Sequence, residues 1–382
     1  MIDKDFLART LVDLIRINST NPSLTPGSPG EAEIGAYLAR LMKTMGLRVK
    51  THLLAPQRVN VVGILKGTGT GRSLMLNAHL DTVGVEGMPA PFSGEIRDGR
   101  VYGRGSQDMK AGLAAVLAAA GAIIAFGEKL RGDLIIAGVA DEEFASAGTA
   151  DLVKHYQADA AIVTEPTDLV IGRAHRGFIW FEVETTGRAA HGSRFTEGID
   201  AIVHMGRFLA GLDRLEKDLR ERPPHVLAGP PSLHASTIHG GSELSIYPAR
   251  CLLALERRTI PGETVDQAAQ ELQHIIDRLR DEDSQFQASV RSTMWRNPFE
   301  IDSSAEIIRL VEKVITRQLG RPPRHGGTSF WTDAAILADA GIPSVLLGPI
   351  GAGLHSSEEW VDLQSTVDLA EILAATTKEF CA

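Results

Sequence analysis

Residues 73–83 read SLMLNAHLDTV, a short apolar run that ends in a histidine and an aspartate. An apolar run of this length between polar segments is typical of a buried strand. His79 and Asp81 stand two positions apart, so on an extended chain their side chains point to the same face. A metal site would need this arrangement. A strand-end histidine bonded to a nearby aspartate would produce it equally well, and this motif alone does not separate the two interpretations.

The same pattern recurs along the chain and predicts the fold. Apolar runs followed by a glycine or an acidic residue stand at 133–143 (DLIIAGVADEE), 159–166 (DAAIVTEP) and 342–349 (IPSVLLGP), with helical patterns between them. Such alternation predicts a mainly parallel sheet flanked by helices, an α/β fold.

A different order of elements occupies residues 178–292. There the pattern reads β-α-β-β-α-β, the ferredoxin-like plan. We therefore expect a discontinuous catalytic domain, residues 1–177 and 293–382, interrupted by an inserted α+β domain, residues 178–292.

Composition excludes several classes of protein. The net charge is −9 and no dense run of Lys or Arg is present, which argues against a nucleic-acid partner. Two cysteines cannot build a disulfide framework, and the first residues lack the apolar centre of a signal peptide. The most apolar stretch, 111–126, is too short for a membrane span and contains two glycines. We expect a cytoplasmic protein without a membrane partner.

Carboxylates cluster directly after the apolar run at 134–140. Asp141, Glu142 and Glu143 follow one another there, and three adjacent carboxylates at the exit of a buried strand repel one another unless a cation is present. Neighbouring residues of an extended segment point to opposite sides, so Glu142 and Glu143 should have different tasks. The residues alone do not say which of the two binds metal.

Three further polar residues stand at similar places. Asp108, in GRGSQDMKAG at 103–112, reads locally as a helix cap. Glu165 follows the run at 159–164, and His355 follows a glycine-rich loop. Ligands of open α/β sheets bind at the carboxyl ends of the strands. Histidines and carboxylates gathered there fit a dinuclear site for Zn, Co or Mn.

Five segments, in this order, resemble a known family of metallohydrolases. They are HLDTV at 79–83, GRGSQDMKAG at 103–112, DEE at 141–143, TEPT at 164–167 and GAGLHSSEEW at 351–360. The family includes acetylornithine deacetylase, succinyl-diaminopimelate desuccinylase, aminoacylase and carboxypeptidase G. The resemblance covers nearly the whole chain. It implies a zinc-exopeptidase-like catalytic domain, an inserted lid that also forms a homodimer, and two divalent metal ions per subunit, zinc in the first place and Co or Mn as alternatives.

The resemblance also implies roles for the strand-end residues. The implied metal ligands are Asp108 as the bridge, with a cis peptide bond after it, His79 and Glu165 at the first ion, and Glu143 and His355 at the second. Asp81 would orient His79 by accepting its other ring N–H. Glu142 would be the general base that takes a proton from a metal-bridging water and passes it to the leaving amine.

Within the lid, the family implies two further functional residues. His191 would stabilise the oxyanion, reaching the site of the partner subunit in dimeric members. Arg258 would clamp a substrate carboxylate, a task that suits a planar guanidinium, whereas Arg257 is interpreted as a surface charge.

Other residues of the substrate pocket are expected from the same resemblance. Thr328 and Asp333 belong to GGTSFWTDA at 326–334, a segment that shapes the pocket in the family. Ser245 stands where the family usually carries asparagine, and its single hydroxyl puts the usual substrate contact in doubt.

The function predicted from these residues is hydrolysis of the amide bond of an N-acyl amino acid, as in acetylornithine deacetylase. A dipeptidase or carboxypeptidase of the same family and a succinyl-diaminopimelate desuccinylase are the enzymatic alternatives. A metal-free binding or scaffold protein is the non-enzymatic alternative, and the presence of all five ligands argues against it. The expected partner is a small N-acyl amino acid or a dipeptide.

Overall fold

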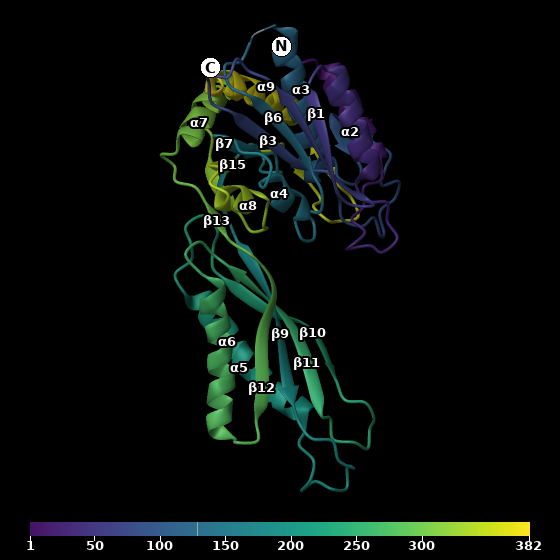
Figure 1. The fold of residues 1–382 in the computed structure, drawn as a ribbon, viewed down its shortest axis with the longest axis vertical. Coiled ribbons are helices and arrows are strands. Elements are labelled where there is room, and N and C mark those ends of the chain that lie inside the picture. Colours follow the sequence, from purple (N-terminus) through teal and green to yellow (C-terminus); the bar gives the residue numbers. More distant parts are fainter. Residues whose placement is uncertain (128) are drawn as a thin grey trace. The chain divides into compact units, whose positions relative to one another are not determined.

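The computed structural model describes residues 1–127 and 129–382. The chain forms two compact units, coloured along the sequence in Figure 1. The larger unit comprises Met1–Arg173, Ile301–Gly326 and Thr332–Ala382, and the inserted unit comprises Ala174–Glu300 and Gly327–Trp331. The expected bounds of the inserted domain are 178–292, whereas this unit begins four residues earlier, ends eight residues later and also includes the short segment 327–331.

A mainly parallel sheet forms the centre of the larger unit, as predicted. Its strand order is β1-β2-β6-β3-β7-β15-β8-β13, and β14 pairs with β8. The neighbours β6, β3, β7 and β15 run parallel, whereas β1 and β2 at one end are antiparallel. The strands are β1 (Arg48–Ala55), β2 (Arg58–Leu65), β3 (Leu74–His79), β6 (Leu134–Val139), β7 (Ala160–Val163), β8 (Ile171–His175), β13 (Phe299–Glu300), β14 (His325–Thr328) and β15 (Ser344–Leu346). Every residue of β3, β6, β7 and β15 is buried, which explains why their sequences are mostly apolar.

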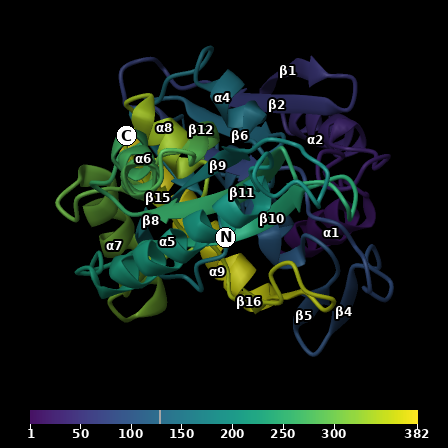
Figure 2. The same ribbon diagram turned by 90° about the horizontal axis from the view of Figure 1, so that it is seen from below.

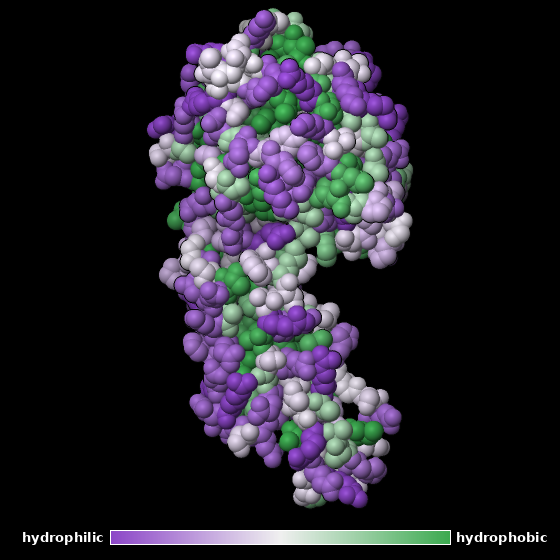
Figure 3. All heavy atoms as spheres, viewed as in Figure 1, coloured by the Kyte–Doolittle hydropathy of each residue, from purple (hydrophilic) through white to green (hydrophobic). Residues whose placement is uncertain are grey.

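Helices pack against this sheet. They are α1 (Lys4–Arg16), α2 (Ala32–Thr44), α3 (Ala111–Ala125), α4 (Ala147–Leu152), α7 (Glu306–Leu319), α8 (Ala334–Asp339) and α9 (Leu363–Phe380). The segment Ser106–Ala125 is long and apolar enough to cross a membrane, yet 78% of it is buried inside the protein, where α3 packs against α1, α9 and β3. It is therefore a core helix. The face drawn in Figure 3 carries mainly hydrophilic side chains, with apolar ones in separate groups.

A small antiparallel sheet brings distant segments of the larger unit together. Its order is β16-β17-β5-β4, from β4 (Glu95–Arg97), β5 (Arg100–Tyr102), β16 (Gly351–Ala352) and β17 (Trp360–Asp362). β17 pairs with β5, so the loop before β17 lies beside the π-helical turn Ser106–Lys110, which leads into α3. Two of the motif segments named above are therefore neighbours in space.

The inserted unit has the predicted β-α-β-β-α-β order. Its antiparallel sheet has the order β10-β11-β9-β12, from β9 (Gly177–Thr186), β10 (Ser232–Gly240), β11 (Arg250–Thr259) and β12 (Gln287–Arg296). Helices α5 (Ala201–Glu221) and α6 (Val265–Glu282) pack against the sheet (Figure 2). Burial alternates along β9 and β11 because one face carries these helices. A separate hydrophobic core lies between sheet and helices.

Candidate metal centre

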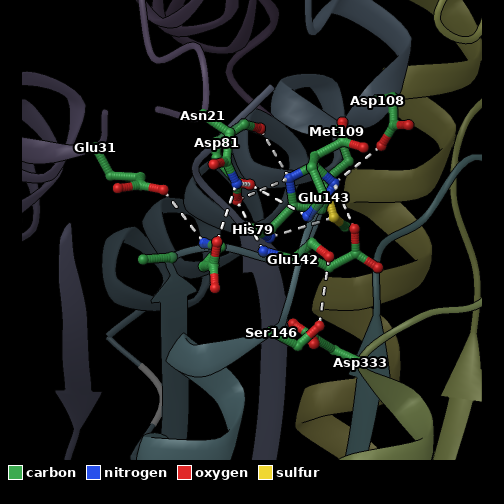
Figure 4. Close-up of polar contacts among 12 residues, drawn as sticks. Asn21, Glu31, His79, Asp81, Asp108, Met109, Glu142, Glu143, Ser146 and Asp333 are labelled. Carbon is green, nitrogen blue, oxygen red and sulfur yellow. Dashed lines mark hydrogen bonds and ion pairs between the residues drawn. The ribbon is translucent and has the colours of Figure 1, made fainter. Parts of the chain in front are cut away.

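The polar strand ends meet at one edge of the central sheet. In the parallel register, His79 at the end of β3 lies opposite Val139 at the end of β6, and Asn77 lies opposite Val163 at the end of β7. The residues that follow these strands, among them Glu143 and Glu165, therefore emerge at the same edge. Figure 4 shows His79, Asp81, Asp108, Glu142 and Glu143 gathered there.

Two groups of metal-ligating side chains share Asp108. One group is His79, Asp108 and Glu165, and the other is Asp108, Glu143 and His355. Asp108 Oδ1 lies 2.9 Å from His79 Nε2, while its Oδ2 lies 3.4 Å from His355 Nε2. His355 Nε2 is also 3.1 Å from Glu143 Oε2, and His79 Nε2 is 4.0 Å from Glu165 Oε1. The two oxygens of one carboxylate thus face two different groups, the arrangement that a bridging ligand needs.

The electrostatics of these side chains show that they fit cations. Burial, followed by repulsion from neighbouring carboxylates, raises the pKa of Glu165 well above its usual value, and burial likewise raises the pKa of Glu143. Among the described residues no hydrogen-bond partner reaches Glu165 Oε1, although this atom is buried. Burial raises the pKa of Asp108, but hydrogen bonds with His355 and His79 outweigh it and keep this carboxyl ionised. Carboxylates beside imidazoles, with one buried oxygen still unpaired, form a set of ligands that suits divalent metal ions.

Asp81 contacts His79 differently from the expectation. The nearest partner of His79 Nδ1 is the main-chain carbonyl of Asp81, at 2.9 Å, whereas the carboxylate Oδ1 is 3.7 Å away. The carboxylate instead accepts hydrogen bonds from the backbone N–H groups of Glu142, at 3.1 Å, and Glu143, at 3.2 Å. Asp81 therefore orients the histidine through its backbone and holds the acidic loop through its side chain.

A buried network that the sequence did not reveal lies behind this loop. Asn21 Nδ2 donates to Asp81 Oδ2 at 2.8 Å, and Arg58 contacts Glu31 at 2.7 Å and Asp141 at 2.8 Å. Asp141 has a positive φ of 71°, a conformation that a non-glycine residue adopts at an energetic cost. The network stabilises this turn, from which Glu142 and Glu143 project in different directions. Asn21, Glu31 and Arg58 belong to none of the five motifs, and no local pattern marks them.

A second anchor, Glu359, holds the turn that carries Asp108. Its carboxylate accepts from Arg104 Nη1 at 2.7 Å and from the backbone N–H groups of Gly105, Gln107 and Asp108 at 3.0, 2.8 and 3.0 Å. Glu359 is four residues beyond His355, so one short segment positions ligands from two parts of the chain. It stands inside the motif GAGLHSSEEW, but only the histidine was singled out there. The peptide bond between Asp108 and Met109 is cis.

Comparison with known proteins identifies the family. The model of peptidase family M20/M25/M40 matches residues 75–379. The chain belongs to this family. It is 31% identical to acetylornithine deacetylase of Myxococcus xanthus, over 98% of this chain and 97% of the relative. It is 30% identical to N-formyl-4-amino-5-aminomethyl-2-methylpyrimidine deformylase of Bacillus subtilis, over 97% of this chain and 95% of the relative.

Solved structures show the same fold. Aminopeptidase PepT from Bacillus cereus superposes with a TM-score of 0.80 at 18% identity, covering 100% of both chains. A dinuclear metal-binding peptidase of the M20 family from Bacillus subtilis superposes with a TM-score of 0.76 at 15% identity, covering 99% of both chains. This M20 family protein is a dinuclear metal hydrolase that acts on amide bonds.

Glu142 lies beside the two ligand groups of this M20 hydrolase and belongs to neither. Its Oε2 is 4.0 Å from His79 Nε2, and its side chain is 10% exposed. Burial, and then the charge of Glu165, raise its pKa well above the usual value. Glu142 is thus a carboxylate beside the two groups and outside both.

Asp333 is buried in the larger unit. It is 1% exposed, and its Oδ2 accepts from Thr149 Oγ1 at 2.7 Å. Burial raises its pKa to about 6. The substrate contact expected of Asp333 stays a prediction. Its side chain is buried in the larger unit, and after burial its charge contributes to the raised pKa of both Glu142 and Glu165. Thr328, in the inserted unit, is half-buried, and its hydroxyl donates to the Phe330 carbonyl at 3.0 Å.

The predicted lid residues lie in the inserted unit. His191 and Ser245 are exposed and near each other, because Gly192 N donates to the Ser245 carbonyl at 2.7 Å. Arg258 is half-buried on β11 and contacts Glu256 at 2.6 Å. Arg257 is 3% exposed and pairs with Glu263 at 2.7 Å, so its interpretation as a surface charge is wrong.

Proposed function

We propose that this enzyme removes a short acyl group, acetyl or formyl, from the amine of a small molecule, an N-acyl amino acid in the first place. The observation that carries the proposal is Glu142, a buried carboxylate that stands beside two joined ligand groups and belongs to neither. Two relatives at about 30% identity, a deacetylase and a deformylase, both act on short acyl amides by their names, and this supports the acyl preference.

The residues divide the chemistry among themselves. Two divalent ions, held by the groups that Asp108 joins, would supply the Lewis acidity that polarises an amide carbonyl and acidifies water. The ions are zinc in this proposal, with Co or Mn as alternatives.

Glu142 carries the proton in the proposed reaction. A carboxylate whose surroundings favour its protonated form accepts a proton from water readily and can deliver it to the leaving nitrogen. Hydrogen bonds with His355 and His79 keep Asp108 ionised, the form in which it would bind cations. The inserted unit supplies the remaining groups of the proposal.

His191 and Arg258 are proposed for the substrate. His191 would donate to the oxygen that becomes negative during attack, from the partner subunit of a homodimer formed through the inserted unit. Arg258 would bind a substrate carboxylate through its guanidinium fork. Their placement supports these roles, since His191 is exposed and Arg258 half-buried on the antiparallel sheet.

A substrate panel tests the function. The enzyme loaded with Zn, Co or Mn is assayed on N-acetyl-ornithine, other N-acetyl and N-formyl amines, N-succinyl-diaminopimelate and free dipeptides. We expect the highest kcat/KM on an acetylated or formylated amine. Faster cleavage of free dipeptides would contradict the proposal and establish a peptidase, and faster cleavage of the succinyl compound would establish a desuccinylase.

A further inference from the structure

A third group of metal-ligating side chains lies outside the dinuclear centre. It consists of His52 on β1, Asp151 on α4 and His155 just beyond the end of α4. One ligand atom from each lies within 4.8 Å of the other two. None of these residues belongs to the five motif segments or to the proposed reaction. His52 and Asp151 are half-buried and His155 is exposed, so solvent ions reach the group.

The two imidazoles are held in place by packing. Their rings stack with centroids 5.1 Å apart and an interplanar angle of 21°. Tyr156 packs edge-on against His52, and its hydroxyl lies 2.8 Å from His52 Nε2. When Nε2–H donates to this hydroxyl, Nδ1 carries the free lone pair, and a bond of this kind to the second nitrogen is typical of metal-binding histidines.

The chemistry of the group selects a borderline divalent cation. The carboxylate of Asp151 lies 3.7 Å from His155 Nε2 and supplies one negative charge. Two histidine nitrogens and one carboxylate oxygen suit Zn²⁺, and Cu²⁺ more tightly still. The exposed Lys154 competes with a cation for this carboxylate, because its Nζ also lies 3.7 Å from Asp151 Oδ1.

We propose that His52, Asp151 and His155 form a third, peripheral site for Zn²⁺ on the larger unit. Occupancy of this site links β1 to α4. Helix α4 follows the acidic loop of the metal centre, and its Thr149 donates to the buried Asp333. A cation that binds only the folded chain stabilises it by mass action, so the third ion is expected to stabilise this part of the unit.

Metal counting on the zinc-loaded holoenzyme tests the site. Wild type and His155→Gln are dialysed to equilibrium against micromolar Zn²⁺ and analysed for zinc by mass spectrometry. We expect wild type to bind one equivalent of zinc more than His155→Gln. When both proteins carry only the zinc content of the variant, their kcat values should be the same. His234→Gln, which removes an exposed histidine of the inserted unit, should keep the extra equivalent.

A second measurement does not depend on affinity for zinc. Cu²⁺ added to zinc-loaded wild type should give an electron paramagnetic resonance signal with nitrogen hyperfine coupling, and His52→Gln and His155→Gln should each remove it. Zn²⁺ should also raise the midpoint of thermal unfolding in wild type more than in His155→Gln. The proposal is overturned if wild type and His155→Gln bind the same number of zinc ions, or if the copper signal survives in both variants.

Discussion

Asp108 is the residue on which the metal centre depends most, since its two oxygens face histidines of different ligand groups. The remaining ligands each belong to one group only. Glu142 and Glu143 are neighbours in sequence but differ in this respect, because Glu143 contacts His355 while Glu142 stays outside both groups. That difference gives the two carboxylates separable roles.

Replacement of each carboxylate by its amide should separate base from ligand. Glu142→Gln keeps the volume but cannot accept a proton, so kcat should fall by about 10²- to 10⁴-fold with both metals retained. Glu143→Gln should lose metal, because an amide is a poorer ligand than a carboxylate. Steady-state kinetics and metal analysis of the purified variants check both outcomes. Full metal content in Glu143→Gln together with metal loss in Glu142→Gln would reverse the assignment.

Substitution of Arg258 tests how the enzyme recognises a substrate carboxylate. Arg258→Met should raise KM for N-acetyl-ornithine at least about tenfold, since a charged hydrogen bond contributes about 1.5 to 3 kcal/mol. KM for an N-formyl amine without a carboxylate should change little. Arg250→Met is the matched control, because Arg250 lies on the same strand and pairs with Glu184. Equal effects of Arg258→Met on both substrates would exclude the carboxylate clamp.

At the scale of elements, two arginines hold the segments that carry the ligands through contacts with carboxylates. Arg58 contacts Glu31 and Asp141 behind the acidic loop, and Arg104 contacts Glu359 behind the turn of Asp108. Arg104 and Glu359 are 3% and 1% exposed, and each depends on the other for its charge partner. Removing one charge from such a pair leaves the other unpaired in a buried place.

Glu359→Gln should therefore weaken both folding and metal binding. We expect a loss of about 3 kcal/mol in the free energy of unfolding, because the Arg104 charge remains buried without its partner. The affinity for the metals should fall as well, since Asp108 loses the acceptor of its backbone N–H. Urea unfolding and a competition titration with a chelator measure the two effects. The control is Glu358→Gln, at an exposed neighbour, which should change neither the free energy of unfolding nor the metal affinity. If Glu359→Gln is as stable as wild type and binds the metals equally well, Glu359 is dispensable.

Sequence patterns predicted the strands, and the strand-end positions of His79, Glu143 and Glu165, for one shared reason. Buried parallel strands need continuous apolar runs, and residues directly after such runs emerge at one edge of the sheet. Asn21 and Arg58 were not predicted because their partners lie far away in the sequence and no local pattern marks them. Glu359 stands inside a motif, but its partners Arg104 and Gly105 lie more than 250 residues away. Arg257 was misinterpreted although a signal existed: it continues the buried face of β11 every second residue after Leu253 and Leu255.

At the scale of the whole molecule, each unit has its own hydrophobic core and only the larger unit contains the dinuclear ligands. Cations that bind the folded larger unit should stabilise that unit alone. Removal of the metals with a chelator should therefore speed hydrogen exchange in β3 and β6, and leave β9 and β11 unchanged. Mass spectrometry of peptides from both units measures this. Equal acceleration in both units would show that they unfold as one.

The stability of the whole chain should also depend on the protonation of Glu31. Burial, followed by the charge of Asp81, raises the pKa of this carboxyl from 4.5 to about 7. Between pH 4.5 and pH 7, Glu31 is therefore protonated in the folded chain and ionised in the unfolded chain. The Glu31 contribution is therefore most favourable below pH 4.5 and is lost as the pH rises to 7, by about 3 kcal/mol in total.

Glu31→Gln removes this titration and isolates its effect. Wild type and variant carry the same two ions, so the pH dependence of metal binding cancels in their difference. From pH 5 to pH 8 the free energy of unfolding of the variant should rise relative to wild type by about 2 to 3 kcal/mol, because only wild type must ionise the buried carboxyl. Urea unfolding at both pH values measures the difference. Glu33→Gln, on the exposed side of α2, is the control. Its free energy of unfolding relative to wild type should be the same at pH 5 and at pH 8. A pH-independent difference for Glu31→Gln would mean that Arg58 keeps Glu31 ionised throughout.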